Sequence, residues 1–358
     1  MMNIKQYHLD NGIVAIEPEH VSAGDGFDAI IKQNKSTIMT ILKQQGVVLL
    51  RNFAIKNAQN FNKAIIESLN FENIETVNKF YKLHNFRNKM IDKSLGLNRL
   101  DNRKFAKYTT HTLGKDNEYI QGPHVEYGMI NNRPRYISMY CERTSKGAAD
   151  TGIYNLHKAY ESLNEAEKKI YNHAWNSYGY YFKLSNRISK FIAYLFLYKK
   201  WPPFKLFSKN DAFPPIIFPK TPMVCLHPEN QSPCLQPFPF YNSTDAAVYQ
   251  ASVETFINRH QGEFLAPDTL KVDSNWLLVD KNNKPIEWTE TDKIHFFKKI
   301  FETAIIHTWQ ENDILIIDNV MFGHGRMENQ GGQVRNMHQL LLNKVDMKNY
   351  AFDLNTKR

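Results

Sequence analysis

The sequence predicts a mainly β protein with added helices, of the α+β class, whose strands form a β-sandwich or barrel. Residues 47–50, Val-Val-Leu-Leu, form a continuous apolar run typical of a buried strand. Residues 136–141 combine aromatic and β-branched side chains in alternation, and residues 313–318 contain a second buried run. Helical patterns lie between these strands, so we expect helices that decorate a sheet core.

Four segments have the spacing of amphipathic helices. The first begins near residues 36–37, which can cap it, and ends at Gly46. Residues 56–90 carry helical spacing in their first part, and residues 156–175 and 291–307 place apolar side chains on one face. We therefore expect two helices within the first 90 residues and two within the later part of the chain.

We expect one domain, residues 1–358, with a helix and loop insertion at about 156–300. Residues 197–245 are rich in proline and aromatic residues, which favours loops and short strands. Residues 188–201 resemble an amphipathic surface helix. A lid or a contact in a homo-oligomer is the favoured interpretation of that helix, ahead of membrane docking.

The composition disfavours several functional classes. The net charge is +9, but the basic residues are scattered, which favours a solvated surface over a nucleic-acid or membrane partner. Three cysteines at no metal-like spacing fit a reducing compartment. The amino-terminal residues lack an apolar signal segment, and no apolar run is long enough to span a bilayer. We expect a cytoplasmic protein.

The first candidate metal ligands are His124 and Glu126. In an extended strand, residues two apart point to the same face, so the two side chains can bind one metal ion. Tyr127 would then point to the opposite face, toward the core. A single His-x-Glu pair is more often an ordinary polar strand edge, so this pair alone does not establish a site.

The second candidate lies at the end of the later predicted strand. His324 stands between two glycines, which allow the backbone to approach closely and leave the ring accessible. Alone, it would be interpreted as a loop histidine after a core strand. Together with His124 and Glu126 it completes two histidines and one carboxylate, the ligand set of non-haem iron(II) oxygenases.

An iron site of this kind leaves room for a chelating 2-oxo acid and for dioxygen. The distal carboxylate of the 2-oxo acid needs a cation and a hydroxyl, which Arg335 and Thr151 can supply. Arg326 is the alternative cation. Among other polar residues, we expect His227 at the surface, with a position in the active site as the alternative, and His307 packed in the interior. Arg133 precedes a proline in a turn, where a plain structural position is favoured over a role in an ion pair or near substrate.

These motifs resemble the taurine dioxygenase (TauD/TfdA-like) superfamily of iron(II)- and 2-oxoglutarate-dependent oxygenases. The similarity covers roughly residues 35–345, and it is carried by Gly46 to Phe53, Pro123 to Glu126, Arg133-Pro134, Gly147 to Thr151, and Trp309 to Arg335.

The resemblance implies a double-stranded β-helix, or jelly-roll, with iron(II) held by His124, Glu126 and His324. It also implies that Thr151 and Arg335 bind 2-oxoglutarate. Thr151 follows Glu126 by 25 residues and Arg335 follows His324 by 11, which agrees with the spacing in the family. The family's Gly-Gly-Glu-Thr-like motif is Ala-Ala-Asp-Thr here, which is a departure.

The block of residues 309–335 is most similar to the SyrP-like hydroxylases. That likeness implies hydroxylation of an amino acid, free or tethered to a carrier protein. Glu126 argues against halogenation, because related halogenases have a small residue at this position. The alternatives are a small sulfonate, phosphonate or carboxylate substrate, a desaturase or cyclase, a non-catalytic metal scaffold, and a basic nucleic-acid-binding protein.

Overall fold

The computed structural model describes residues 4–19, 26–74, 105–106, 109–111, 120–182, 205–206, 216–217, 219–239, 246–256, 272–327 and 334–352. Its strands are β1 (Ile4–His8), β2 (Val14–Pro18), β3 (Val47–Leu50), β4 (Phe105–Ala106), β5 (Thr109–His111), β6 (Asn132–Thr144), β7 (Thr151–Asn155), β8 (Trp175–Phe182), β9 (Lys205–Leu206), β10 (Ile216–Ile217), β11 (Thr221–Pro222), β12 (Val224–Leu226), β13 (Pro233–Leu235), β14 (Val272–Val279), β15 (Pro285–Ile286), β16 (Ala304–His307), β17 (Ile314–Asp318), β18 (Phe322–Arg326) and β19 (Arg335–Asp346). Its helices are α1 (Phe27–Gln33), α2 (Lys35–Gln45), α3 (Ala58–Asn62), the π-helix η1 (Lys63–Ser68), α6 (Leu156–Glu161), α7 (Glu165–Tyr171), α9 (Ala246–Thr255), α10 (Glu290–Phe301) and the 3-10 helix η3 (Met347–Tyr350).

The largest sheet has the strand order β1-β2-β3-β17-β6-β19-β5-β4. Its central strands divide their side chains between two cores. Val48 and its cross-strand neighbour Ile316 belong to the core that also contains side chains of α1, α2, α3 and η1, whereas Leu49 and Leu315 belong to the core on the other face. Burial on both faces explains why these strands appear in the sequence as continuous apolar runs.

A smaller sheet, β16-β7-β18, lies against the second face of the large sheet. Ile153 of β7 and Phe322 of β18 share one core cluster with Leu49 and Leu315 of the large sheet. The predicted mainly β architecture with added helices is therefore present as a mixed, sheet-rich fold that is compatible with a β-sandwich core.

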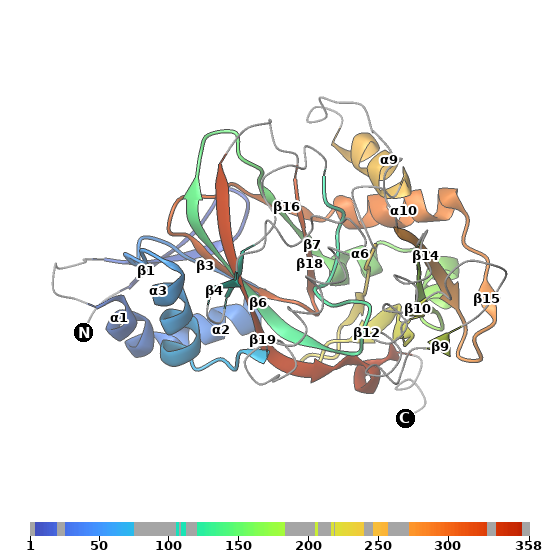
Figure 1. Cartoon of the computed structure of the whole chain (residues 1–358), viewed down its shortest axis with the longest axis horizontal. Helices are drawn as coiled ribbons and strands as arrows, with labels where there is room; N and C mark the ends of the chain where they lie inside the picture. The colour runs from blue at the N-terminus through green and yellow to red at the C-terminus, as the bar shows by residue number, and fades with distance from the viewer. Residues whose placement is uncertain are drawn as a thin grey trace, which may run out of the picture.

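The segment between residues 156 and 300 contributes a further sheet, with the order β15-β14-β8-β10-β9 and with β11 paired to β8. An aromatic core joins this sheet to helix α10. Tyr178 stacks on Trp276 with ring centroids 5.6 Å apart, and Trp276 contacts Phe297 edge-on. Figure 1 shows α9 and α10 at one end of the molecule and α1 to α3 at the other.

The predicted helix over residues 156–175 is wrong in its extent. It is divided into α6 and α7, because the side chain of Asn164 and that of Glu167 form a capping box that starts a new helix. Trp175 begins strand β8, whose pairing with β14 outweighs the helical pattern.

The predicted helix over residues 291–307 is also too long. Helix α10 ends at Phe301, and Thr303 closes the turn by donating its backbone N–H to the carbonyl of Ile300. The remaining residues form β16, which pairs antiparallel with β7. This strand supports the site described below, so the difference matters for function.

The predicted helix ending at Gly46 is confirmed as α2. It begins one residue before the predicted cap, after Asn34, and Gly46 adopts a φ of 72°. A Cβ on Gly46 would lie 2.4 Å from the ring of Phe322, so glycine is required here for space as well as for conformation. In the segment 56–90, α3 and η1 confirm the helical pattern as far as Ser68; residues 75–90 and 188–201 lie outside the described residues.

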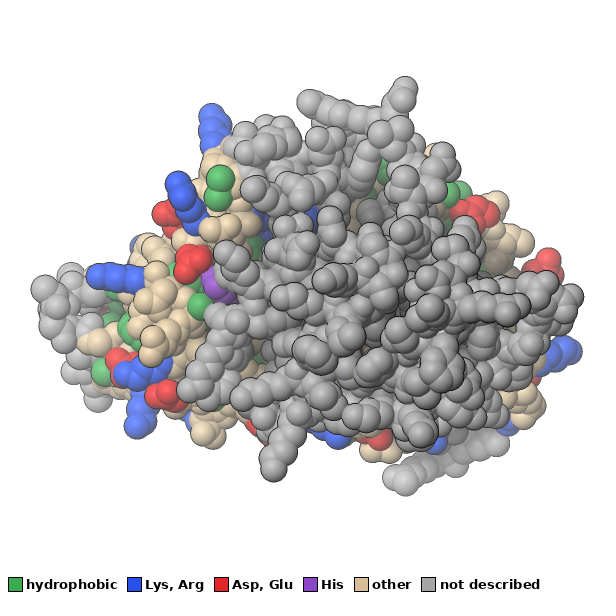
Figure 2. Space-filling view, viewed as in Figure 1, with side chains coloured by type: hydrophobic (Ala, Val, Ile, Leu, Met, Phe, Trp, Pro, Cys, Tyr) green, Lys and Arg blue, Asp and Glu red, His purple; other side chains and the backbone are tan. Residues whose placement is uncertain are grey.

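Charged side chains are intermixed on the described part of the surface. Figure 2 shows Lys and Arg side chains lying among Asp and Glu side chains near the N-terminal helices, as the scattered pattern in the sequence predicts. Among the described residues, no helix has both the length and the apolar character needed to cross a membrane.

Candidate metal centre and co-substrate pocket

His124 and His324 meet across an isolated antiparallel bridge. The N–H of His124 donates to the carbonyl of His324 at 3.0 Å, and the N–H of His324 donates to the carbonyl of His124 at 2.8 Å. Strand β18 carries His324 between Gly323 and Gly325. A Cβ on Gly325 would lie 2.3 Å from the carbonyl oxygen of Gln121, so only glycine permits this approach.

The two imidazoles and the carboxylate of Glu126 converge on one point. Nε2 of His324 lies 3.6 Å from Oε2 of Glu126, and Nε2 of His124 lies 4.0 Å from the same oxygen. One ligand atom from each residue lies within 4.8 Å of the other two. Within the described ranges, this is the one group of three or more His, Cys, Asp or Glu side chains that could hold a metal ion.

The protonation of His124 suits a metal ligand. Its Nδ1 lies 3.0 Å from the carbonyl oxygen of Gly122, and a carbonyl oxygen only accepts hydrogen bonds. Nδ1 therefore carries the proton, and Nε2 presents its lone pair toward Glu126. Burial, together with the nearby His324, lowers the pKa of His124 to about 4, so the ring is neutral near pH 7. The donor set thus fits a divalent ion such as iron(II).

The backbone of Glu126 is held by Asn319. Oδ1 of Asn319 accepts from the N–H of Glu126 at 2.7 Å, while Nδ2 donates to the carbonyls of Glu126 at 3.1 Å and of Pro134 at 2.9 Å. Tyr127, the next residue, has a φ of 58°, so the backbone leaves the extended conformation directly after Glu126. The extended strand predicted through His124 and Glu126 is therefore a single bridge at His124 followed by a turn.

The carboxylate of Glu126 is kept ionised by its neighbours. Burial acts to raise its pKa, but the attraction of the nearby imidazoles of His324 and His124 outweighs burial and lowers the pKa to about 2. Nε2 of Gln339 also donates to Oε2 at 3.3 Å. An ionised carboxylate is the form that binds a metal cation.

Asp318 anchors the turn that presents Asn319. Its Oδ1 accepts from the backbone N–H groups two and three residues ahead, at 2.9 and 3.2 Å. Arg135 pairs with Oδ1, and Nε2 of His227 lies 2.9 Å from Oδ2. The expectation of a surface position for His227 is wrong, since this side chain is buried against Asp318.

Thr151 and Arg335 also meet, in the interior. Nη2 of Arg335 donates to Oγ1 of Thr151 at 2.8 Å, and both residues are buried. The cross-strand neighbour of Thr151 in β18 is Arg326. Arg326 is two residues after His324 in β18. The side chains of Arg326 and of its cross-strand neighbour Thr151 therefore lie on the face of the sheet that carries the metal-site histidine.

Arg335 is a buried, positively charged side chain. Burial, with a contribution from the nearby Arg326, lowers its pKa to about 10, which leaves it charged at neutral pH. The carboxylate of Asp150 is near enough to oppose this lowering, but among the described residues no carboxylate lies within ion-pair distance of the Arg335 guanidinium. Because a buried charge without a direct partner is costly, the pocket favours a carboxylate ligand at this position.

Two other expectations have definite outcomes. His307 is packed in the interior, as predicted, with its Nε2 3.4 Å from Oδ2 of Asp313. Arg133 is fully buried and donates to the side chain of Gln236, so it has a structural environment in the interior and no ion pair with a described carboxylate.

Three residues that support this site have no predicted role in the sequence: Asn319, Trp309 and Gln339. The Asp318-Asn319 pair directly before the histidine strand was a usable signal, because such residues form side-chain turns. Gln339 and Trp309 offered no such signal, since their contacts depend on pairing between distant strands.

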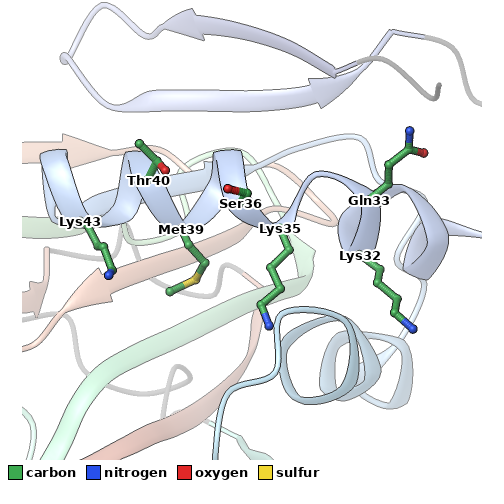
Figure 3. Close-up of a pocket in the computed structure, with 7 residues that line it drawn as sticks. All are labelled: Lys32, Gln33, Lys35, Ser36, Met39, Thr40 and Lys43. Atoms are coloured by element: carbon green, nitrogen blue, oxygen red, sulfur yellow. The ribbon is translucent and has the colours of Figure 1, made fainter.

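A surface depression of about 550 Å³ lies elsewhere, over α1 and α2. Figure 3 shows Lys32, Lys35, Met39 and Lys43 pointing to the same side of these helices. None of the convergent histidine and carboxylate residues lines this depression. It is therefore separate from the candidate metal centre.

Comparison by sequence identifies a family. The sequence model of the taurine catabolism dioxygenase TauD, TfdA family matches residues 9–341. A search of curated proteins finds no significant match to this protein.

Comparison by structure finds related folds at low sequence identity. PvcB from Pseudomonas aeruginosa matches with a TM-score of 0.50 and 11% identity, over 95% of this chain and 91% of that one. A second PvcB structure, of an Fe, alpha-ketoglutarate dependent oxygenase from an isonitrile synthetic pathway, gives 0.51 and 11%, over 96% and 94%. A Burkholderia xenovorans protein assigned to the alpha-ketoglutarate-dependent taurine dioxygenases gives 0.50 and 12%, over 95% and 93%.

Proposed function

From the premise that this chain belongs to the taurine catabolism dioxygenase TauD, TfdA family, and is an iron(II)- and 2-oxoglutarate-dependent oxygenase, we propose that it hydroxylates an amino acid. The observation that carries the site assignment is the convergence of His124, Glu126 and His324 within 4.8 Å. The amino acid is free or attached to a carrier protein, and dioxygen and 2-oxoglutarate are the co-substrates.

His124, Glu126 and His324 are the proposed iron ligands. When iron(II) is bound, it activates dioxygen for oxidation of an unactivated carbon. The protein's own contribution is to fix the donors. Gly122 sets the tautomer of His124, and Asn319 holds the backbone of Glu126.

Thr151 and Arg335 are the proposed binding residues for the distal carboxylate of 2-oxoglutarate. The support is the direct hydrogen bond between them and the burial of a guanidinium that has no described carboxylate as partner. Their position fits a ligand that reaches from the metal, because Arg326, the cross-strand neighbour of Thr151, lies two residues from His324.

The proposed architecture around this site is a double-stranded β-helix within one domain, residues 1–358. In this proposal the two sheets that share the core of Leu49, Ile153 and Phe322 are the halves of the jelly-roll. The segment from about 156 to 300 is an insertion between the sequence motifs that supply the metal ligands.

The substrate class rests on the sequence. Residues 309–335 resemble the SyrP-like hydroxylases, and Glu126 retains the carboxylate that related halogenases lack. The net charge of +9 is complementary to an acidic carrier protein and would speed encounter. A small sulfonate, phosphonate or carboxylate, or desaturation or cyclisation by the same cofactor chemistry, is the alternative.

The first experiment is an anaerobic titration of the protein with iron(II) and 2-oxoglutarate, followed by visible absorption. A weak charge-transfer band that requires both components is expected. The substrate is then sought by mass spectrometry of free and carrier-bound amino acids, incubated aerobically with both cofactors. Turnover of a sulfonate or phosphonate alone, with no amino acid gaining oxygen, would replace the proposed substrate class.

A further inference from the structure

Both acceptor positions of the Thr151 hydroxyl are occupied. Nε1 of Trp309 and Nη2 of Arg335 each donate to Oγ1 of Thr151 at 2.8 Å. Indole and guanidinium nitrogens are donors only, and a hydroxyl has two acceptor lone pairs and one proton. The proton of Thr151 is therefore available only for donation to a third group, which must be an acceptor.

Trp309 is held firmly where it makes this contact. Its ring is buried and lies edge-on to the ring of His307, with centroids 4.7 Å apart. His307 in turn contacts Asp313, whose carboxylate is bound at both oxygens by Arg51 at 2.7 Å. The guanidinium carbon of Arg335 lies 5.9 Å from the centre of the Trp309 ring.

Because of these contacts, Arg335 and Thr151 offer the ligand only hydrogen-bond donors. Arg335 can offer only N–H donors, and the orientation of Thr151 leaves it with only an O–H donor. A carboxylate has only acceptor atoms, so it satisfies both residues at once. A neutral carboxamide at the same place has only one acceptor oxygen, so its NH2 group would face one of these donors and binding would be weaker.

We propose that Trp309 is a positioning residue for the co-substrate, whose indole N–H orients the Thr151 hydroxyl as a hydrogen-bond donor to the distal carboxylate of 2-oxoglutarate. This inference rests on the proposed function. Trp309 acts through Thr151, and its contribution to affinity therefore depends on the presence of the hydroxyl. The gain is pre-organisation, because the hydroxyl has no alternative orientation to lose on binding.

A double-mutant cycle tests this dependence. The dissociation constant of 2-oxoglutarate is measured anaerobically on the iron(II) protein from the visible band, for wild type, Trp309→Phe, Thr151→Val and the double variant. We expect Trp309→Phe to weaken binding by about 2- to 12-fold, the range for one neutral hydrogen bond. In the Thr151→Val background the same change should have no further effect, and kcat should change less than KM for 2-oxoglutarate.

Trp175→Phe is the matched control, because Trp175 is a buried indole whose Nε1 has no hydrogen-bond partner among the described residues. It should leave the affinity for 2-oxoglutarate unchanged. If Trp309→Phe fails to fold, site-specific replacement of Trp309 by 3-benzothienylalanine keeps the ring shape and removes the N–H.

The outcomes separate the two proposals. If Thr151→Val and Arg335→Leu leave 2-oxoglutarate affinity unchanged, the proposed carboxylate pocket is wrong. If Thr151→Val weakens binding but loss of the Trp309 N–H does not, only the role of Trp309 is overturned. An effect of the Trp309 change that persists in full in the Thr151→Val background overturns it equally.

Discussion

The single carboxamide of Asn319 binds both backbone groups of Glu126, the N–H at 2.7 Å and the carbonyl oxygen at 3.1 Å. This contact replaces the strand pairing that is lost where the backbone turns at Tyr127. The position of the carboxylate in the metal centre therefore depends on a residue that is not itself a ligand.

Asn319→Ala should lower the affinity for iron(II) by about 10- to 100-fold, the usual effect of removing a partner that orients a ligand. The measurement is an anaerobic iron(II) titration of the purified variant. Asn11→Ala is the matched control, because Asn11 also bonds two backbone groups, those of Ile13 and Ile306. Iron affinity equal to wild type in Asn319→Ala would show that Glu126 needs no such support.

Two glycines beside His324 should differ in their tolerance of a methyl group. In Gly325→Ala the new Cβ would lie 2.3 Å from the carbonyl oxygen of Gln121, whereas in Gly323→Ala it would lie 3.2 Å from that of His124. The first change must displace backbone, with a cost of about 1–3 kcal/mol or more. Urea unfolding and iron content should both be worse for Gly325→Ala, and the reverse order would contradict the bridge geometry.

His124→Ala, Glu126→Ala and His324→Ala should each abolish succinate formation and strongly weaken iron binding. Each removes one of three donors that converge within 4.8 Å. His295→Ala is the control, since its side chain is 49% exposed and bonds Glu167. A ligand variant with native iron content and near-native turnover would remove that residue from the proposed ligand set.

The central strands of the large sheet could be predicted because they are buried on both faces, and their local sequence is accordingly a continuous apolar run. Val48 and Leu49 face different cores, so both faces of the strand had to be apolar, and the run was recognisable. The glycine beside His324 was equally informative, since only glycine permits the contact that Gly325 makes.

Other features depend on contacts between segments that are far apart in the sequence. The local periodicity of the sequence does not reveal such contacts. Ile305 and Ile306 extend a helical pattern, yet they pair with β7 as a strand. His227 was expected in a polar surface loop, but Asp318 and Arg135 from other segments surround it. The capping box at Asn164 was readable in the sequence and would have corrected one helix boundary.

Arg335→Leu should raise the requirement for 2-oxoglutarate by about ten-fold or more, because it removes a charge-assisted hydrogen bond to the carboxylate. Iron affinity in the absence of 2-oxoglutarate should be nearly unchanged. Arg326→Leu is the informative comparison, since Arg326 is the cross-strand neighbour of Thr151. A larger effect at Arg326 than at Arg335, in apparent KM for 2-oxoglutarate, would exchange the proposed roles of the two arginines.

The buried pair of Arg51 and Asp313 should make the protein's stability depend on pH in the acid range. Nε and Nη2 of Arg51 each lie 2.7 Å from a carboxylate oxygen of Asp313. Burial acts to raise the pKa of Asp313, but the hydrogen bonds from Arg51 and the nearby His307 ring outweigh burial and lower it. The stability that this ionised carboxylate contributes is therefore complete above the unfolded-state pKa of about 3.9 and is lost as the pH falls through the folded-state pKa.

Asp313→Asn keeps the shape of the side chain but leaves the Arg51 guanidinium buried without its carboxylate, with an expected cost of about 3–5 kcal/mol in the free energy of unfolding at pH 7. Urea unfolding of wild type and variant at pH 7 and at pH 3 measures this difference. We expect the difference to shrink at pH 3, because the Asp313 carboxyl is mostly protonated in the unfolded wild type at that pH, so folding must release a proton and part of the pair's contribution is lost. A difference that stays constant between the two pH values would mean that the ionised pair does not contribute to stability, and that the substitution acts through packing alone.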